Sequence, residues 1–137
     1  MRTLILGSIL FLLSLGVTSA QILSPVTFTM DTEFVAGNTT FPAGSYEIVP
    51  TDDQSVLEIR GQKGAPAALF EIEPLRSVTP FKQTELVFNK YAEHMVLKEV
   101  MVAGETEGAT TVTTNAEKRH RKEHGKPIRV RHPAKKK

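Results

Sequence analysis

The sequence of 137 residues contains no cysteine. This absence excludes a disulfide-stabilised scaffold, a thiolate metal site and the attachment of a lipid through a thiol. The folded chain must therefore be held together by an apolar core. A domain of roughly 100 residues can build such a core, although it buries only about 60–65% of the surface of its unfolded chain.

A long apolar run is also absent. The nearly continuous run from Leu4 to Val17 covers 14 residues, fewer than the roughly 18–20 that a helix needs to cross a bilayer. A short positive start containing Arg2 precedes this run, and small residues ending in Ala20 follow it. This layout is typical of a secretory signal peptide, 1–20, with cleavage after Ala20. We therefore expect a secreted or periplasmic protein, the alternative being an uncleaved N-terminal anchor.

Acidic residues are nearly absent from the end of the chain. Residues 118–137 contain ten lysines and arginines and one acid, whereas residues 21–117 contain six lysines and arginines and fourteen acids. Such asymmetry between segments says more about local electric fields than the small net charge of +2 does. We interpret the chain as an acidic domain, 21–114, followed by a basic tail, 115–137.

The domain 21–114 is predicted to be mainly β. Apolar and polar residues alternate in 26–30, in 45–49 and in 56–60, as they do in strands with one buried face. Segments rich in glycine, proline and aspartate separate these runs. We expect a single small antiparallel β-barrel or sandwich of about six to eight strands, with no transmembrane span.

Turn residues predict how some of these strands are connected. Phe41-Pro42-Ala43-Gly44 matches a type I turn that closes a hairpin with a glycine bulge. Residues 85–89 and 95–102 flank a short polar segment and form a second hairpin candidate. Residues 104–114 are either a last edge strand or a linker.

The tail is predicted to form a short helix followed by disorder. Residues 115–124 are helix formers behind a possible cap at Thr114 or Asn115, and Gly125 provides a stop signal. This helix has almost no apolar face to bury, so it should be marginal alone. Residues 126–137 are rich in basic residues and contain two prolines, which favours disorder.

The basic tail is the segment from which a function can be predicted. Its cations would attract an anionic surface polymer, anionic lipid head groups or an acidic face of another protein. Sequence-specific nucleic-acid recognition is not expected, because the tail has no aromatic residue to stack on bases. The alternative is a tail that is solubilising or that docks on the acidic domain of its own chain. The ten predicted polyanion-binding residues are Lys118, Arg119, Arg121, Lys122, Lys126, Arg129, Arg131, Lys135, Lys136 and Lys137.

His120 and His124 are four residues apart, so on a helix they would share a face and could hold a divalent metal. We interpret them instead as titratable positive charge, because the neighbouring cations oppose metal binding. Residues 21–117 contain one histidine, His94, within a predicted hairpin turn. We therefore predict no metal and no cofactor.

Paired carboxylates are the remaining candidates for chemistry. They occur at Asp31/Glu33, Asp52/Asp53 and Glu71/Glu73. No calcium-loop pattern and no serine-nucleophile motif accompanies them, so we interpret them as solvated surface groups. The predicted function is that of an exported, non-catalytic binding or structural module. Two alternatives are a protein-binding β module with an incidental tail and a carboxylate-dependent hydrolase.

Two stretches, FVAGNTTFPAGSYEI and LVFNKYAEHMVLKEV, carry a resemblance to known proteins. Over about residues 26–102 the chain resembles small exported β-proteins of bacteria, notably of acidobacterial genomes, which have no assigned activity. The resemblance implies a β fold and an extracytoplasmic location, and it implies no active site. The basic tail departs from this pattern.

Overall fold

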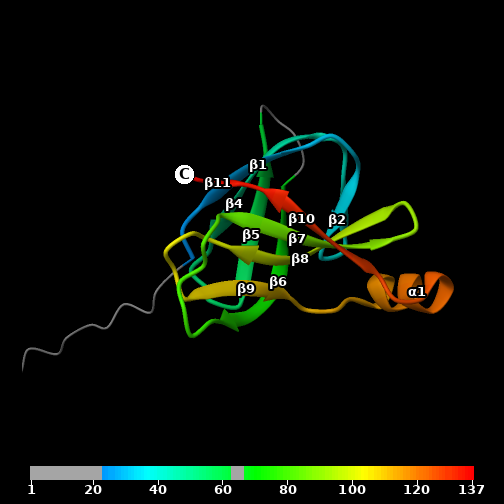
Figure 1. Cartoon of the computed structure of the whole chain (residues 1–137). Coiled ribbons are helices and arrows are strands. Elements are labelled where there is room, and N and C mark those ends of the chain that lie inside the picture. The colour runs from blue at the N-terminus through cyan, green and yellow to red at the C-terminus, as the bar shows by residue number, and fades with distance from the viewer. Residues whose placement is uncertain (1–22, 63–66) are drawn as a thin grey trace, which may run out of the picture.

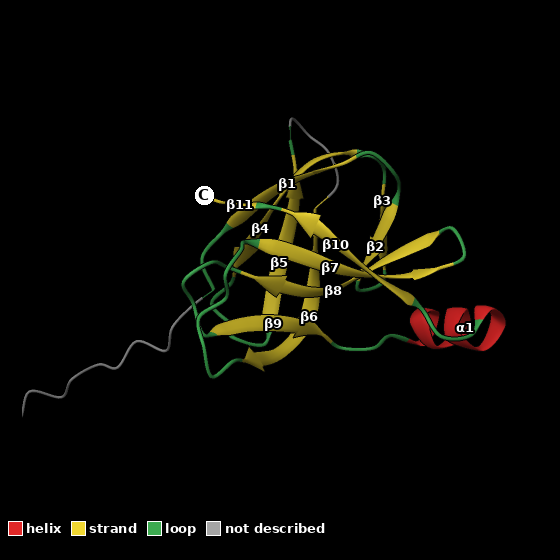
Figure 2. Cartoon of the chain, viewed as in Figure 1, coloured by secondary structure: helices red, strands yellow, loops and turns green. Residues whose placement is uncertain are grey.

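The computed structural model describes residues 23–62 and 67–137 (Figure 1). The predicted signal peptide, 1–20, lies outside these residues. Within the described part the chain is mainly β and has one helix near the C-terminus, as the sequence predicts; its strands number eleven (Figure 2). The helix has ten residues, and no helix in the described ranges is long and apolar enough to span a membrane.

The strands form one open mixed sheet. Their order is β10-β7-β8-β9-β6-β5-β4-β1-β11; β2 pairs with β3 and, in parallel, with β8. The expectation of a barrel or sandwich with six to eight strands is therefore wrong, because the described strands number eleven and do not close into a barrel. The strands are β1 (Val26–Met30), β2 (Phe34–Ala36), β3 (Thr39–Phe41), β4 (Gly44–Pro50), β5 (Val56–Gly61), β6 (Ala67–Arg76), β7 (Glu85–Tyr91), β8 (His94–Met101), β9 (Glu107–Thr111), β10 (Ile128–Pro133) and β11 (Lys135–Lys136).

The alternation in the sequence correctly predicts which side chains face the core. Val26, Phe28 and Met30 of β1 are buried, while the threonines between them are more exposed. Phe28 belongs to an aromatic cluster at the centre of the core, in which ring centroids lie 5.1–5.9 Å apart. Each such pair contributes about 0.5–1.5 kcal/mol beyond the burial of its surface. The cluster consists of Phe28, Phe34, Phe41, Tyr46 and Phe88.

The turn predicted at Phe41–Gly44 does not close a hairpin. Strand β3 pairs with β2, whereas β4 pairs with β1 and β5. The bend therefore connects two strands that follow each other in the chain but are not paired in the sheet. The Tyr46 hydroxyl donates a hydrogen bond to the carbonyl of Pro42 at 2.5 Å and holds the bend. The hairpin lies one turn earlier, at Gly37-Asn38, where Gly37 adopts a φ of 61°.

The disorder predicted for 126–137 is wrong for most of that segment, because it contains β10 and β11. Strand β10 pairs antiparallel with β7 from Ile128↔Lys90 to Pro133↔Glu85. Strand β11 continues onto β1, and the backbone N–H of Lys137 donates to the carbonyl of Pro25. The segment thus provides hydrogen-bond partners for backbone groups of β7 and β1. Without β10 and β11 these two strands would be the edges of the sheet, with unpaired backbone groups.

Residues 104–114 contain β9, which is an interior strand between β6 and β8 and not an edge or a linker. Its Gly108 approaches β8 closely: a Cβ added there would lie 2.5 Å from the carbonyl oxygen of Val100. Gly108→Ala is therefore expected to lower the free energy of unfolding by about 2–3 kcal/mol, measured by urea denaturation.

Gly104 provides the matched control for this substitution. A Cβ at Gly104 would meet nothing within 4 Å, so Gly104→Ala carries only the backbone strain of its φ of 83°, about 1 kcal/mol. Equal urea midpoints for Gly108→Ala and the wild-type chain would contradict the close packing of β8 and β9.

Candidate functional site

Helix α1 (Asn115–His124) carries four of the ten predicted cations and the His120/His124 pair, and it projects beyond the sheet near the turn of the β7–β8 hairpin (Figure 1). Its predicted ends are confirmed. The Thr114 side chain accepts a hydrogen bond from the backbone N–H of Glu117 at 3.2 Å and caps the helix. At the other end Gly125 has a φ of 79°, and its N–H donates to the carbonyl of Arg121.

A buried carboxylate, Glu117, attaches α1 to the sheet. Its Oε1 accepts hydrogen bonds from Asn89 Nδ2 at 3.1 Å and from the Tyr91 hydroxyl at 3.0 Å, and Lys98 Nζ lies 3.3 Å from Oε2. Burial, together with the nearby Glu117, raises the pKa of Tyr91. The helix is thus held by a polar network in place of the apolar face that it lacks, and the sequence did not indicate this anchoring role of Glu117.

The helix has two chemically different faces. Successive residues are rotated by about 100°, which places Glu117, His120 and His124 within an arc of about 60° that we call the inner face. The four cations fall on an arc of about 160° centred on nearly the opposite side, the outer face. The outer-face residues, all exposed, are Lys118, Arg119, Arg121 and Lys122.

The ten predicted polyanion-binding residues are all exposed, but they lie on different elements. Four are on α1 and a fifth, Lys126, follows it, while the rest lie on β10, on β11 and at the C-terminus. The predicted disorder implied one continuous flexible chain of cations. The structure instead distributes the cations over several folded elements.

Three of the ten cations pair with acids of the sheet. Arg129 Nη2 lies 2.8 Å from Glu99, and Lys137 Nζ lies 2.8 Å from Glu47. Arg131 pairs with Glu85 in the same way. These three ion pairs are the contacts expected for a tail that docks on the acidic domain of its own chain, which is the alternative to polyanion binding. In the described part of the chain, the other seven cations form no ion pair with an acid.

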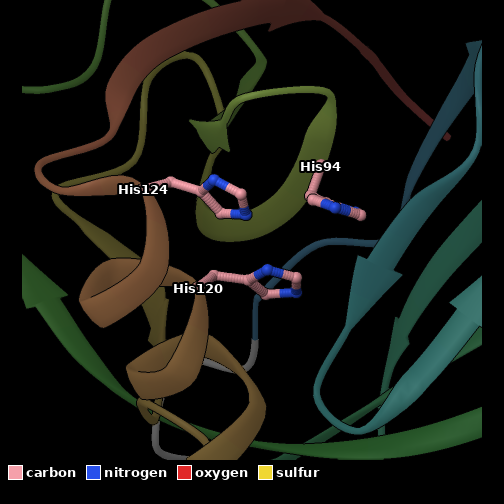
Figure 3. A group of neighbouring side chains, drawn as sticks. All are labelled: His94, His120 and His124. Carbon is pink, nitrogen blue, oxygen red and sulfur yellow. The ribbon is translucent and has the colours of Figure 1, made fainter.

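The structure brings His94 to the two helix histidines (Figure 3). His94 begins β8, directly after a turn in which Ala92 has a φ of 52°. The ring centroid of His94 lies 4.4 Å from that of His120 and 5.8 Å from that of His124. One nitrogen from each ring lies within 4.8 Å of the other two. The sequence indicated the His120/His124 pair, but it did not indicate the third member.

His120 is the most enclosed of the three histidines. Its Nδ1 is buried and, in the described part of the chain, has no hydrogen-bond partner. Its ring stacks on that of Tyr91 at a centroid distance of 6.0 Å. Burial, followed by the neighbouring His94 and His124, lowers the pKa of His120. These influences favour the neutral imidazole, the form that binds metals.

The paired carboxylates remain separate surface groups. All six are exposed. Asp53 Oδ1 accepts hydrogen bonds from the backbone N–H and the hydroxyl of Ser55, and these bonds lower the pKa of Asp53. They have the local role of stabilising the loop between β4 and β5.

Comparison of the chain with protein-family models, curated proteins and solved structures gives no match. The resemblance to exported acidobacterial β-proteins therefore stays a prediction.

Proposed function

We propose that the chain is an exported, non-catalytic binding protein that attaches to an anionic surface polymer or to anionic lipid head groups through the outer face of α1. One observation supports this proposal most directly: four exposed cations gather on one side of a projecting helix. In the described ranges none of them pairs with an acid. Lys126, two residues after the helix, is a further exposed cation near its C-terminal end.

The way α1 is held makes this surface effective. Glu117 and the Thr114 cap order the helix before any ligand binds. Binding therefore does not include the entropy cost of folding a disordered tail. Each lysine or arginine close to an anionic membrane contributes about 1 kcal/mol, and this attraction decays within a Debye length. Binding is therefore expected to weaken steeply as salt rises.

Not all of the ten predicted cations have the same role in binding. Arg129, Arg131 and Lys137 already have carboxylate partners on the sheet, so their fields are partly cancelled before a polyanion approaches. We therefore assign the main binding role to the outer face of α1. Arg129 and Arg131 of β10, together with the C-terminal Lys137, mainly hold the C-terminal segment on the sheet.

Charge substitution tests the proposal without removing a strand. The test variant carries Lys118→Gln, Arg121→Gln and Lys122→Gln, and the control variant carries Arg129→Gln, Arg131→Gln and Lys137→Gln. Both lose three positive charges. At low salt we expect the test variant to bind a sulfated polysaccharide or vesicles with anionic lipid about a hundredfold more weakly than wild type, at about 1 kcal/mol for each lost contact. The control variant should lose much less.

Column elution and vesicle sedimentation measure this difference, and the two probes distinguish a polymer from a lipid surface. Circular dichroism must show that both variants keep the wild-type fold. Equal losses in the two variants would mean that only net charge matters and would contradict a role for this face. Wild-type binding by the helix variant would also reject the proposal.

A further inference from the structure

We infer that His94, His120 and His124 form a site for one divalent transition-metal ion, with Zn²⁺ or Cu²⁺ as the best-suited ions. This site lies on the inner face of α1 and is independent of the proposed binding to polyanions. Imidazole nitrogen is a preferred ligand of zinc, copper and nickel, and three histidines are a sufficient protein ligand set for zinc. Two separate elements supply the ligands: the β7–β8 hairpin and the helix.

The distances allow a metal to be bound with small side-chain movements. Tetrahedral zinc with Zn–N bonds of about 2.0–2.1 Å requires nitrogens roughly 3.3 Å apart, whereas those of the cluster lie within 4.8 Å of one another. His94 and His124 are more exposed than His120, so small side-chain rotations that bring their nitrogens closer to it displace mainly water. In Figure 3 the three rings surround a common space.

The unpartnered nitrogen of His120 is a second observation that favours a ligand. Buried polar atoms almost always have a hydrogen-bond partner, and His120 Nδ1 has none in the described part of the chain. A bound ion would give this nitrogen a partner through its lone pair.

The charges around the cluster are mixed, so the cations of the tail do not exclude a metal. The outer-face cations are centred on nearly the opposite side of the helix, where water and salt screen them, although Arg119 still acts electrostatically on His120. Nearer to the cluster, Glu123 Oε2 lies 3.8 Å from His124 Nε2. Glu33 and Glu93 line a surface hollow together with His94. These carboxylates supply negative charge beside the site.

Three protein ligands leave a coordination position open for water or for a ligand from outside the chain. The bound ion would also connect the β7–β8 hairpin to α1, and so fix the helix at a second point besides Glu117. Metal binding and polyanion binding would then use opposite faces of the same helix.

Zinc titration tests the site directly. The protein is the chain from Gln21 to Lys137, which includes every described element, produced without a histidine affinity tag. Calorimetry is expected to show one Zn²⁺ per chain, and Co²⁺ is expected to give the absorption bands of a nitrogen-ligated site. His94→Ala should weaken zinc binding at least about tenfold. His132→Ala is the matched control, because His132 lies on β10 outside the cluster, and it should bind zinc as wild type does.

Each alternative result would overturn the inference. Absence of zinc binding would reject the site, and equal weakening by His94→Ala and His132→Ala would indicate nonspecific binding. Wild-type affinity in His94→Ala would mean that the helix pair alone holds the metal. Because His94 is exposed, its replacement should leave the circular dichroism spectrum unchanged, so a loss of affinity cannot be attributed to unfolding.

Discussion

A chain that ends at Gly125, and therefore lacks β10 and β11, is expected to lose about 5 kcal/mol of unfolding free energy or to aggregate. Strand β10 contributes six residue pairs to β7, and each backbone hydrogen bond of such a ladder is worth about 0.5–1.5 kcal/mol net. Val130 also packs against the core from this strand. A loss of this size is a large share of the roughly 5–15 kcal/mol that stabilises a typical domain.

Urea denaturation followed by circular dichroism measures this loss, and size-exclusion chromatography detects aggregation through the exposed edge of β7. The control is a full-length chain with Lys135→Gln and Lys136→Gln, which removes charge but keeps the strands. The control should unfold within about 0.5 kcal/mol of wild type. Equal urea midpoints for the shortened and wild-type chains would show that the tail is dispensable for the fold.

The substitution Glu117→Ala is expected to destabilise the chain by about 3 kcal/mol and to release α1 from the sheet. It leaves Asn89 and Tyr91 without their buried acceptor and removes the carboxylate that faces Lys98. Breaking a buried charge pair costs about 3–5 kcal/mol. The lower end applies here, because Lys98 Nζ keeps a hydrogen bond to Thr113 at 2.9 Å.

Glu123→Ala is the matched control on the same helix, since the Glu123 side chain is 65% exposed. It is expected to change the free energy of unfolding by less than about 0.5 kcal/mol. Urea denaturation gives the free energies, and the helical signal in circular dichroism reports the state of α1. Similar stabilities of the two variants would contradict the anchoring role of Glu117.

Much of the fold was predictable because its signals are local. A strand with one buried face requires alternation, and residues 26–30 have it, so Val26, Phe28 and Met30 could be placed in the core correctly. The β7–β8 hairpin was predicted from two apolar segments that flank a short polar one. The ends of α1 depend only on a capping side chain and a glycine, so Gly125 was identified correctly and the cap was limited to Thr114 or Asn115, of which Thr114 is the one observed.

The C-terminal strands were missed although a weak signal was present. Ile128 and Val130 alternate with two arginines, which is a strand pattern. The high charge and the two prolines of the segment led to the prediction of disorder. The composition of a segment does not reveal that an unpaired edge of β7 is available to it. The site was missed for a similar reason. The spacing of His120 and His124 predicts a shared helix face, but only folding brings His94 beside them.

The sequence by itself therefore determined the local elements: an apolar N-terminal run typical of a signal peptide, alternating strands, a capped helix and a basic C-terminal segment. The tertiary structure decided which of these elements meet. It placed the tail on β7 and β1, buried Glu117 between α1 and the sheet, and gathered three histidines from two elements. The physical reason is that alternation and capping act between near neighbours in the chain. Edge pairing and side-chain clustering instead depend on distances that exist only in the folded chain.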